Sequence, residues 1–164
     1  MVIIIEGLDC TGKTTLSKRF SEKYNFTYIK ESYTDSDIEK VNRLNDLFKR
    51  VVQNDQNYIY DRTTVIDDFV YDFLNEKQSS LQDYKDLIYA ILSQCKIIHL
   101  ILDEKTRLKR FNERGDQYIT NDMIEQIRTN YVRFYTNVKN VHFYDLTKDI
   151  EKDVQNIMEV VKND

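Results

Sequence analysis

Residues 7–14 read Gly-Leu-Asp-Cys-Thr-Gly-Lys-Thr, an intact G-x-x-x-x-G-K-T pattern. Gly7 and Gly12 allow backbone N–H groups to turn inward around phosphate oxygens, and Lys13 supplies a cation to the β and γ phosphates. Thr14 offers a hydroxyl group to Mg²⁺. An apolar run precedes the pattern and an amphipathic stretch follows it, so the positive end of a helix would point at the anion. The pattern therefore predicts a loop that binds ATP or GTP together with Mg²⁺.

A second concentration of charge lies in residues 105–114, where five cations accompany one acid. Arg107, Arg110 and Arg114 are spaced by three and four residues, which predicts that they share one face of a helix. Phosphoryl transfer depends on positioning and on neutralising the charge of the transferred group, and the phosphate loop contains no arginine. We therefore expect residues 105–120 to form a lid over the phosphates. The alternative is a basic helix face that is merely solvated.

Short apolar runs alternate with longer amphipathic stretches along the chain. The runs predict five strands, at residues 2–5, 26–30, 58–60, 97–102 and 141–144. Helical periodicity is expected at 13–24, 37–52, 64–74, 81–94, 105–114 and 121–138, with a final helix from Ile150. Apolar strands separated by helices indicate a parallel sheet that is covered on both faces. We therefore expect a three-layer α/β fold with a five-stranded parallel sheet, and ligands at the carboxyl ends of its strands.

The composition limits the classes of function. The chain has 164 residues, of which 41% are apolar and 32% charged, and this fits a single domain over residues 1–164. The net charge of −4 argues against a stable nucleic-acid partner. The apolar runs are far shorter than the ~20 residues of a membrane span, so no membrane association is expected. Cys10 and Cys95 form neither a disulfide framework nor a metal-ligand spacing, which favours a reducing, cytoplasmic setting.

Two large classes of phosphate-loop protein fit the sequence poorly. GTP-binding switches read the base with Asn/Thr-Lys-x-Asp, whereas residues 147–149 read Thr-Lys-Asp without the spacer. Motor ATPases show an apolar strand that ends in Asp-Glu, which residues 97–104 imitate, but a chain of 164 residues leaves little room for such a machine. Asp103 is therefore kept as an alternative metal-side residue. A small-molecule kinase accounts for more of the chain.

Residues 6–15, Glu-Gly-Leu-Asp-Cys-Thr-Gly-Lys-Thr-Thr, resemble the thymidylate kinase version of the phosphate loop, E-G-x-D-x-x-G-K-[ST]-T. Asp61-Arg62 ends the third predicted strand as an Asp-Arg pair does in that family, and Arg114-Gly115-Asp116 resembles its arginine-bearing lid. The resemblance covers most of the chain. It implies a P-loop kinase fold, a role in nucleotide biosynthesis, and transfer of the ATP γ-phosphate to a deoxynucleoside monophosphate, with dTMP as the first expectation.

The motif chemistry and the resemblance together assign roles to individual residues. The residues expected to catalyse transfer are Lys13, Asp9, Arg62, Arg110 and Arg114. Those expected to bind ATP are Gly7, Cys10, Thr11, Gly12, Lys13, Thr14, Thr15 and Arg107. Those expected to bind the acceptor are Asp9, Glu31, Arg43, Arg62 and Phe69, and those expected to bind Mg²⁺ are Thr14 and Asp61. Arginine suits the acceptor phosphate because its planar fork binds two oxygens at once.

The identity of the acceptor stays open at this point. The stretch between the second predicted strand and Asp61 is shorter than in thymidylate kinases, where it selects thymine and builds a dimer surface; the resemblance still allows a homodimer. The segment after Arg114 is similar to deoxynucleoside kinases, which phosphorylate a 5′-hydroxyl and would need a base such as Glu31. A polynucleotide 5′-kinase and a non-catalytic nucleotide-binding module are further alternatives. His99 and His142 lie in predicted strands and are expected to be packed and neutral.

Overall fold

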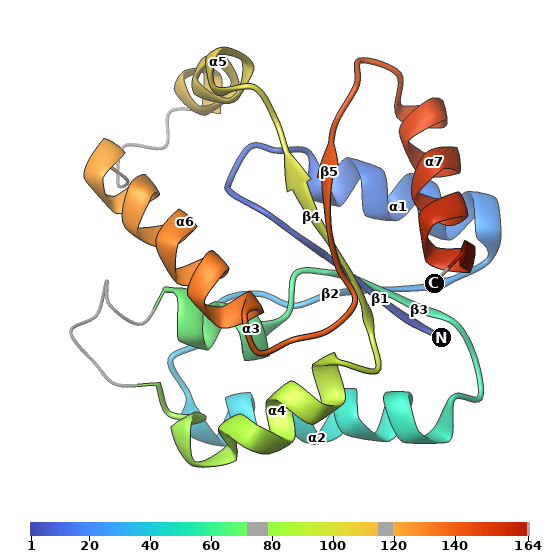
Figure 1. The fold of residues 1–164 in the computed structure, drawn as a ribbon, viewed down its shortest axis with the longest axis vertical. Coiled ribbons are helices and arrows are strands. Elements are labelled where there is room, and N and C mark those ends of the chain that lie inside the picture. Colours follow the sequence, from blue (N-terminus) through green and yellow to red (C-terminus); the bar gives the residue numbers. More distant parts are fainter. Residues whose placement is uncertain (72–78, 115–119, 164) are drawn as a thin grey trace.

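The computed structural model describes residues 1–71, 79–114 and 120–163 (Figure 1). The strands are β1 (Val2–Glu6), β2 (Thr27–Lys30), β3 (Tyr58–Asp61), β4 (Lys96–Ile101) and β5 (Val141–Asp145). The helices are α1 (Lys13–Tyr24), α2 (Asp37–Gln53), α3 (Thr64–Val70), α4 (Lys85–Leu92), α5 (Glu104–Arg114), α6 (Asn121–Tyr135) and α7 (Ile150–Asn163). A 3₁₀ turn at Gln82–Tyr84 precedes α4.

The five strands form one parallel sheet in the order β2-β3-β1-β4-β5. In its register, Val2 lies opposite Tyr58 on one side of β1, and Ile3 lies opposite Lys96 on the other. Every residue of β1 is buried, as expected for a central strand covered on both faces. The predicted fold class is therefore confirmed.

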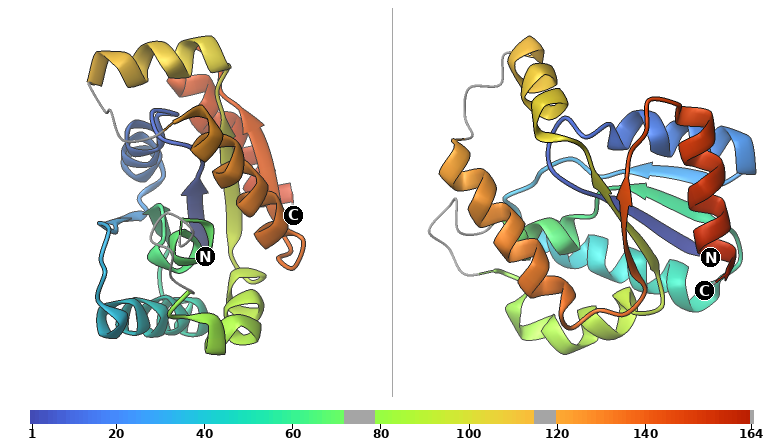
Figure 2. Two further views of the ribbon diagram at one scale, coloured as in Figure 1. Left: turned by 90° about the vertical axis from the view of Figure 1, so that its left-hand side faces the viewer. Right: turned by 45° about the horizontal axis from the view of Figure 1, so that its top comes forward.

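Side chains that alternate along the strands build two separate cores. Ile4 and Tyr60 point to the face covered by α2, α3, α4 and α6, whereas Ile3 and Ile59 point to the face covered by α1 and α7 (Figure 2). Each of these four side chains is fully buried. Burying a large apolar side chain stabilises the fold by about 1.5–3 kcal/mol, so the two cores fix the position of the central strand firmly.

The predicted elements differ from the observed ones mainly at their ends. The helix expected at residues 64–74 is described as far as Val70, and residues 72–78 lie outside the described part. The helix expected at 81–94 divides into the 3₁₀ turn and α4. None of the helices in the described ranges is long and apolar enough to cross a membrane.

Because all strands run in the same direction, the segments that follow them meet at one edge of the sheet. That edge carries the phosphate loop after β1, Glu31 after β2, Arg62 after β3, and α5 after β4 (Figure 1). The loop between β5 and α7 completes it. Most of the residues singled out in the sequence are thus gathered in one place by topology.

Candidate active site

A cleft of about 1030 Å³ opens at this edge of the sheet. Of the residues expected at the site, those lining the cleft are Asp9, Cys10, Thr11, Gly12, Lys13, Thr14, Thr15, Glu31, Asp61, Arg62 and Arg110. The described side chains or backbones of Gly7, Arg43, Phe69 and Arg107 do not line it. On the side of α5 the cleft is lined by Asp103, whose carboxylate accepts a hydrogen bond of 2.9 Å from the Thr106 N–H. Thr147 and Lys148 line it on the side of the loop between β5 and α7.

The phosphate loop has the backbone that its glycines predict. Gly7 has a φ of +135°, and a Cβ atom there would lie 2.7 Å from the Leu100 carbonyl oxygen, so a side chain is excluded twice over. Gly12, at the start of α1, has a φ of +100°. The Lys13 ammonium folds back into the loop and donates to the carbonyl oxygens of Gly7 (2.7 Å) and Leu8 (2.6 Å). These carbonyls hold the cation at the position where phosphates would arrive.

Burial, together with repulsion from Arg62, lowers the pKa of Lys13 to about 8, although Asp9 and Glu6 oppose the shift. A phosphate group would add negative charge next to the ammonium and favour its protonated form. Lys13 is therefore suited to bind polyphosphate as a cation.

The groups expected at the metal lie together. The Thr14 hydroxyl donates to Asp61 Oδ2 over 2.5 Å, and the Tyr28 hydroxyl donates to the same oxygen over 2.9 Å. Magnesium prefers oxygen ligands, and it is usually bound by one or two carboxylates plus phosphate oxygens and waters. The described residues include no group of three or more His, Cys, Asp or Glu side chains that could hold a metal without a substrate. Thr14 and Asp61 thus fit a metal that arrives with the nucleotide.

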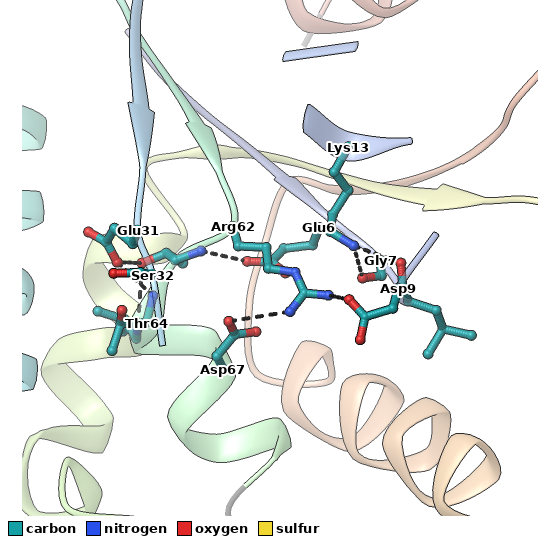
Figure 3. Close-up of polar contacts among 12 residues, drawn as sticks. Glu6, Gly7, Asp9, Lys13, Glu31, Ser32, Arg62, Thr64 and Asp67 are labelled. Carbon is teal, nitrogen blue, oxygen red and sulfur yellow. Dashed lines mark hydrogen bonds and ion pairs between the residues drawn. The ribbon is translucent and has the colours of Figure 1, made fainter. Parts of the chain in front are cut away.

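Arg62 lies between two carboxylates on the wall of the cleft (Figure 3). Its guanidinium group hydrogen-bonds to Asp9 Oδ1, and its Nη1 atom is 3.9 Å from Asp67 Oδ2. It also lies over the ring of Tyr71, with 5.7 Å to the ring centroid. Asp9, expected to bind the acceptor, lines the same cleft and pairs with Arg62. Asp67 was not predicted; its position five residues after Arg62, at the start of an expected helix, was the available signal.

Glu6 is a second residue that sequence reasoning left without a role, although it belongs to the E-G-x-D motif. Its side chain is fully buried, and its two oxygens accept from the Thr63 N–H (3.0 Å) and the Tyr131 hydroxyl (3.1 Å). Burial and the nearby Asp67 raise the pKa of Glu6 to about 8, against the opposing effect of Arg62 and Lys13.

Glu31 and Arg43 organise the start of α3. Glu31 Oε2 accepts a 2.7 Å hydrogen bond from the Thr64 N–H. Arg43 Nη1 donates to the Ser32 carbonyl oxygen and to the Thr64 hydroxyl, each over 2.5 Å. Glu31 nevertheless lines the cleft, whereas Arg43 stands behind it. The expected contact of Arg43 with the acceptor is therefore not made by this arrangement, because its guanidinium group already holds the segment after β2 against α3.

The two arginines of α5 whose side chains are described, Arg107 and Arg110, have different surroundings. Arg110 Nη1 approaches the Cys10 carbonyl oxygen at 3.4 Å and lines the cleft above the phosphate loop. Arg107 is only 2% exposed and donates to Glu104 over 2.6 Å, and Glu104 is also paired with Arg128 of α6. The expectation that Arg107 contacts ATP is corrected accordingly, since this network turns it toward α6. The side chain of Arg114 and residues 115–119 lie outside the described residues.

Two further expectations concern rings. Phe69 packs against Phe134 with 5.3 Å between ring centroids, which gives it a place in the core and none beside an acceptor base. His99 is buried, and its Nδ1 atom lies 3.1 Å from the Tyr135 hydroxyl. Burial, with Lys13 adding to the effect, lowers the pKa of His99 to about 4. The expected neutral, packed state of His99 is thus supported.

Comparison with known proteins places the chain in a family. A family profile described as AAA domain matches residues 3–132, which include the phosphate loop, Asp61 and Arg62. The chain therefore belongs to this family of P-loop proteins. Its fold and phosphate-binding site are those of the P-loop nucleoside and nucleotide kinases.

Two curated relatives match nearly the whole chain. The SPbeta prophage-derived uncharacterized protein YorR of Bacillus subtilis (strain 168) is 28% identical over 148 residues, covering 87% of this chain and 86% of YorR. A probable thymidylate kinase of Methanosphaera stadtmanae is 28% identical over 186 residues, covering 93% and 94% of the two chains.

Solved structures agree with this assignment. The structure of YorR in complex with phosphorylated GDP matches with a TM-score of 0.68 at 25% identity, over 99% of this chain and 96% of that one. The deoxyadenosine kinase from M. mycoides with bound dCTP matches with a TM-score of 0.61 at 25% identity over all of both chains. The similarity to thymidylate kinases expected from the motifs is confirmed, and the chain is also similar to a deoxyadenosine kinase.

Proposed function

We propose that the protein transfers the γ-phosphate of ATP to a deoxynucleoside monophosphate, with dTMP as the first acceptor to test. The observation that carries this proposal is the position of Arg62 on the cleft wall, beside the Thr14–Asp61 pair. Its guanidinium group is turned into the site, where the phosphate of an acceptor would replace the Asp9 carboxylate as its partner. The probable thymidylate kinase relative is consistent with a monophosphate acceptor.

The residues of the cleft have complementary tasks in such a reaction. An oxygen of the acceptor phosphate attacks the γ-phosphorus, the bond to the β–γ bridging oxygen breaks, and ADP leaves. Lys13 and Arg110 approach the phosphates from the loop and from α5, and they offset the charge that moves during transfer. Thr14 and Asp61 would hold Mg²⁺, which supplies further charge neutralisation when bound.

No side chain has to remove a proton when the acceptor is a monophosphate. The second pKa of a phosphate group is about 6, so the attacking oxygen is already ionised at neutral pH. A nucleoside 5′-hydroxyl is not ionised and needs a carboxylate within reach. Glu31 lines the cleft, and this observation supports a deoxynucleoside kinase as the second candidate. The deoxyadenosine kinase match is consistent with it.

An acceptor panel with a matched Glu31→Gln variant tests both candidates. We expect the wild-type protein, with ATP and Mg²⁺, to phosphorylate monophosphates, dTMP among them, and to leave nucleosides unchanged. Glutamine keeps an oxygen that can accept from the Thr64 N–H, so the start of α3 should be preserved. With a monophosphate acceptor, Glu31→Gln should then change kcat by less than about tenfold.

Two results would count against the first candidate. Transfer to nucleosides alone, with kcat falling by a factor of ~10³ in Glu31→Gln at unchanged acceptor affinity, would identify a deoxynucleoside kinase. The absence of transfer to any small acceptor, with ATP still bound, would leave a polynucleotide 5′-kinase or a nucleotide-binding module. A 5′-hydroxyl oligonucleotide in the panel separates these two.

A further inference from the structure

The turn that carries Arg62 has an unusual backbone. Arg62 has a φ of +69°, a left-handed conformation that residues with a side chain seldom adopt. It directly follows β3 and precedes α3, so this conformation decides the direction in which the guanidinium group leaves the sheet. Such a backbone persists when its surroundings hold it in place.

Two consecutive residues of β1 hold this turn. The Arg62 N–H donates to the Ile5 carbonyl oxygen over 3.0 Å, and the Thr63 N–H donates to the Glu6 carboxyl group over 3.0 Å. The pairing of β1 with β3 runs as far as Ile5 opposite Asp61, after which β1 leaves the ladder for the phosphate loop. Beyond Ile5, the Glu6 carboxyl group therefore supplies the hydrogen-bond acceptor for the segment after β3, in place of a backbone carbonyl of β1.

Within the described part of the chain, the Glu6 side chain makes this hydrogen bond and one other. It is fully buried, it is not among the described residues that line the cleft, and its second oxygen accepts from Tyr131 of α6. A buried carboxyl group is costly unless its hydrogen bonds are needed. The two hydrogen-bond partners of Glu6, the Thr63 N–H next to Arg62 and the Tyr131 hydroxyl, are therefore the first candidates for its role.

We propose that Glu6 is a positioning residue: by binding the Thr63 N–H, it keeps Arg62 in the left-handed conformation that directs its guanidinium group at the acceptor phosphate. This inference rests on the proposed function, in which Arg62 binds that phosphate. Glu6 itself touches neither substrate.

The proposal specifies which chemical property of Glu6 matters. Positioning needs a hydrogen-bond acceptor at the distance of Oε1, and it does not need a negative charge. Glutamine has that acceptor in a side chain of equal length, whereas methionine has a similar shape without a comparable acceptor. Aspartate retains the carboxyl group but withdraws it by one methylene from Thr63. Glutamine thus removes the charge, methionine removes the acceptor while keeping the packing, and aspartate shortens the side chain.

Steady-state kinetics of Glu6→Met and Glu6→Gln, with acceptor and ATP varied separately, test the proposal. We expect Glu6→Met to raise the KM for the monophosphate or lower kcat/KM for it by about tenfold or more, with the KM for ATP within about twofold. Glu6→Gln should stay within about threefold of the wild type. In an Arg62→Ala background, Glu6→Met should cause no further loss, because its effect passes through Arg62. If Glu6→Met does not fold, Glu6→Asp takes its place with the same expectation.

Tyr131→Phe is the matched control, since it removes the other hydrogen bond of the same carboxyl group. It should leave the KM for the acceptor within about twofold of the wild type. The proposal is overturned if Glu6→Gln is as impaired as Glu6→Met, if Tyr131→Phe reproduces the defect, or if the effects of Glu6→Met and Arg62→Ala add. These outcomes require an active wild-type protein; a wild type that transfers phosphate to no monophosphate would instead contradict the proposed function.

Discussion

Arg107 and Arg110 lie almost one helical turn apart in α5, yet they have opposite surroundings. Arg107 is enclosed by the Glu104–Arg128 network between α5 and α6, whereas Arg110 reaches the carbonyl oxygen of Cys10. A cation held over the phosphate loop can stabilise the transferred group, but a cation paired inside a helix contact cannot. Catalysis is therefore expected to depend on Arg110.

Replacing Arg110 by Ala should lower kcat by a factor of roughly 10³ or more while ATP binding changes much less. Lys109→Ala is the control, because it removes a charge of the same sign from the same helix at a side chain that is 77% exposed. Its turnover should match the wild type. Single-turnover transfer and nucleotide binding measured on both variants check this. Unchanged turnover in Arg110→Ala would indicate a protein that binds nucleotide without needing a lid cation.

At the scale of elements, α5 is the part expected to move. Its cations at Lys105 and Arg110 are exposed, and the phosphate loop already contains Lys13. Like charges on neighbouring segments repel until phosphate charge offsets them, so ligand binding should order this region and exclude water from the γ-phosphate. We propose that residues 105–120 act as a lid, of which residues 115–119 lie outside the described part of the chain.

Amide hydrogen exchange of residues 105–114 should slow when a bisubstrate analogue of ATP and acceptor binds. The exchange of α4, which lies away from the cleft, should stay the same and serves as the internal control. Measurement with ATP alone and with the analogue shows whether both substrates are required. Strong and equal protection of α5 in the free and bound protein would mean that α5 is rigid, and the lid would have to be abandoned.

The strands and the phosphate loop could be predicted from the sequence because their signals are local. The apolar run at residues 2–5 indicates a buried strand without reference to the rest of the chain. The spacing of Gly7, Gly12 and Lys13 likewise indicates the shape of the phosphate loop from eight consecutive positions. Helix ends were less certain, as the division of the segment before β4 into a 3₁₀ turn and α4 shows. The periodicity of a short segment does not show at which residue packing against other elements ends the helix.

Contacts between distant segments could not be predicted in the same way. Glu6 finds its partners 57 and 125 positions away, and Glu104 binds Arg128 from the next helix. Periodicity placed Arg107 and Arg110 on one helical face, but the neighbour that each of them meets depends on how α5 is tilted against α6. The sequence therefore predicted which residue types line the cleft, but it did not predict the buried contacts, such as those of Glu6 and Glu104, that hold them in place.

At the scale of the whole molecule, two buried groups give stability opposite dependences on pH. The pKa of Glu6 is raised from 4.5 to about 8, so the folded state holds a proton that the unfolded state releases, and stability falls as pH rises from 4.5 to 8. The pKa of His99 is lowered from 6.5 to about 4, so its contribution is complete above pH 6.5 and is lost as pH falls toward 4. The two slopes oppose each other below pH 6.5, and only that of Glu6 continues above it.

The wild-type protein without ligand should therefore lose up to about 2 kcal/mol of unfolding free energy between pH 6.5 and 8, at no more than about 1.4 kcal/mol per pH unit. Glu6→Gln should remove this loss, because glutamine does not titrate. The other titratable and charged groups around Glu6 are present in both proteins: Lys13, whose lowered pKa of about 8 adds a slope of opposite sign near pH 8, and Arg62, Asp67 and Tyr131. His99→Gln, the counterpart, should retain the loss above pH 6.5 and remove the decline toward acid. Urea unfolding from pH 5 to 8.5 measures all three proteins; parallel curves for the wild type and Glu6→Gln would show that the buried carboxyl group titrates alike in the folded and unfolded chain.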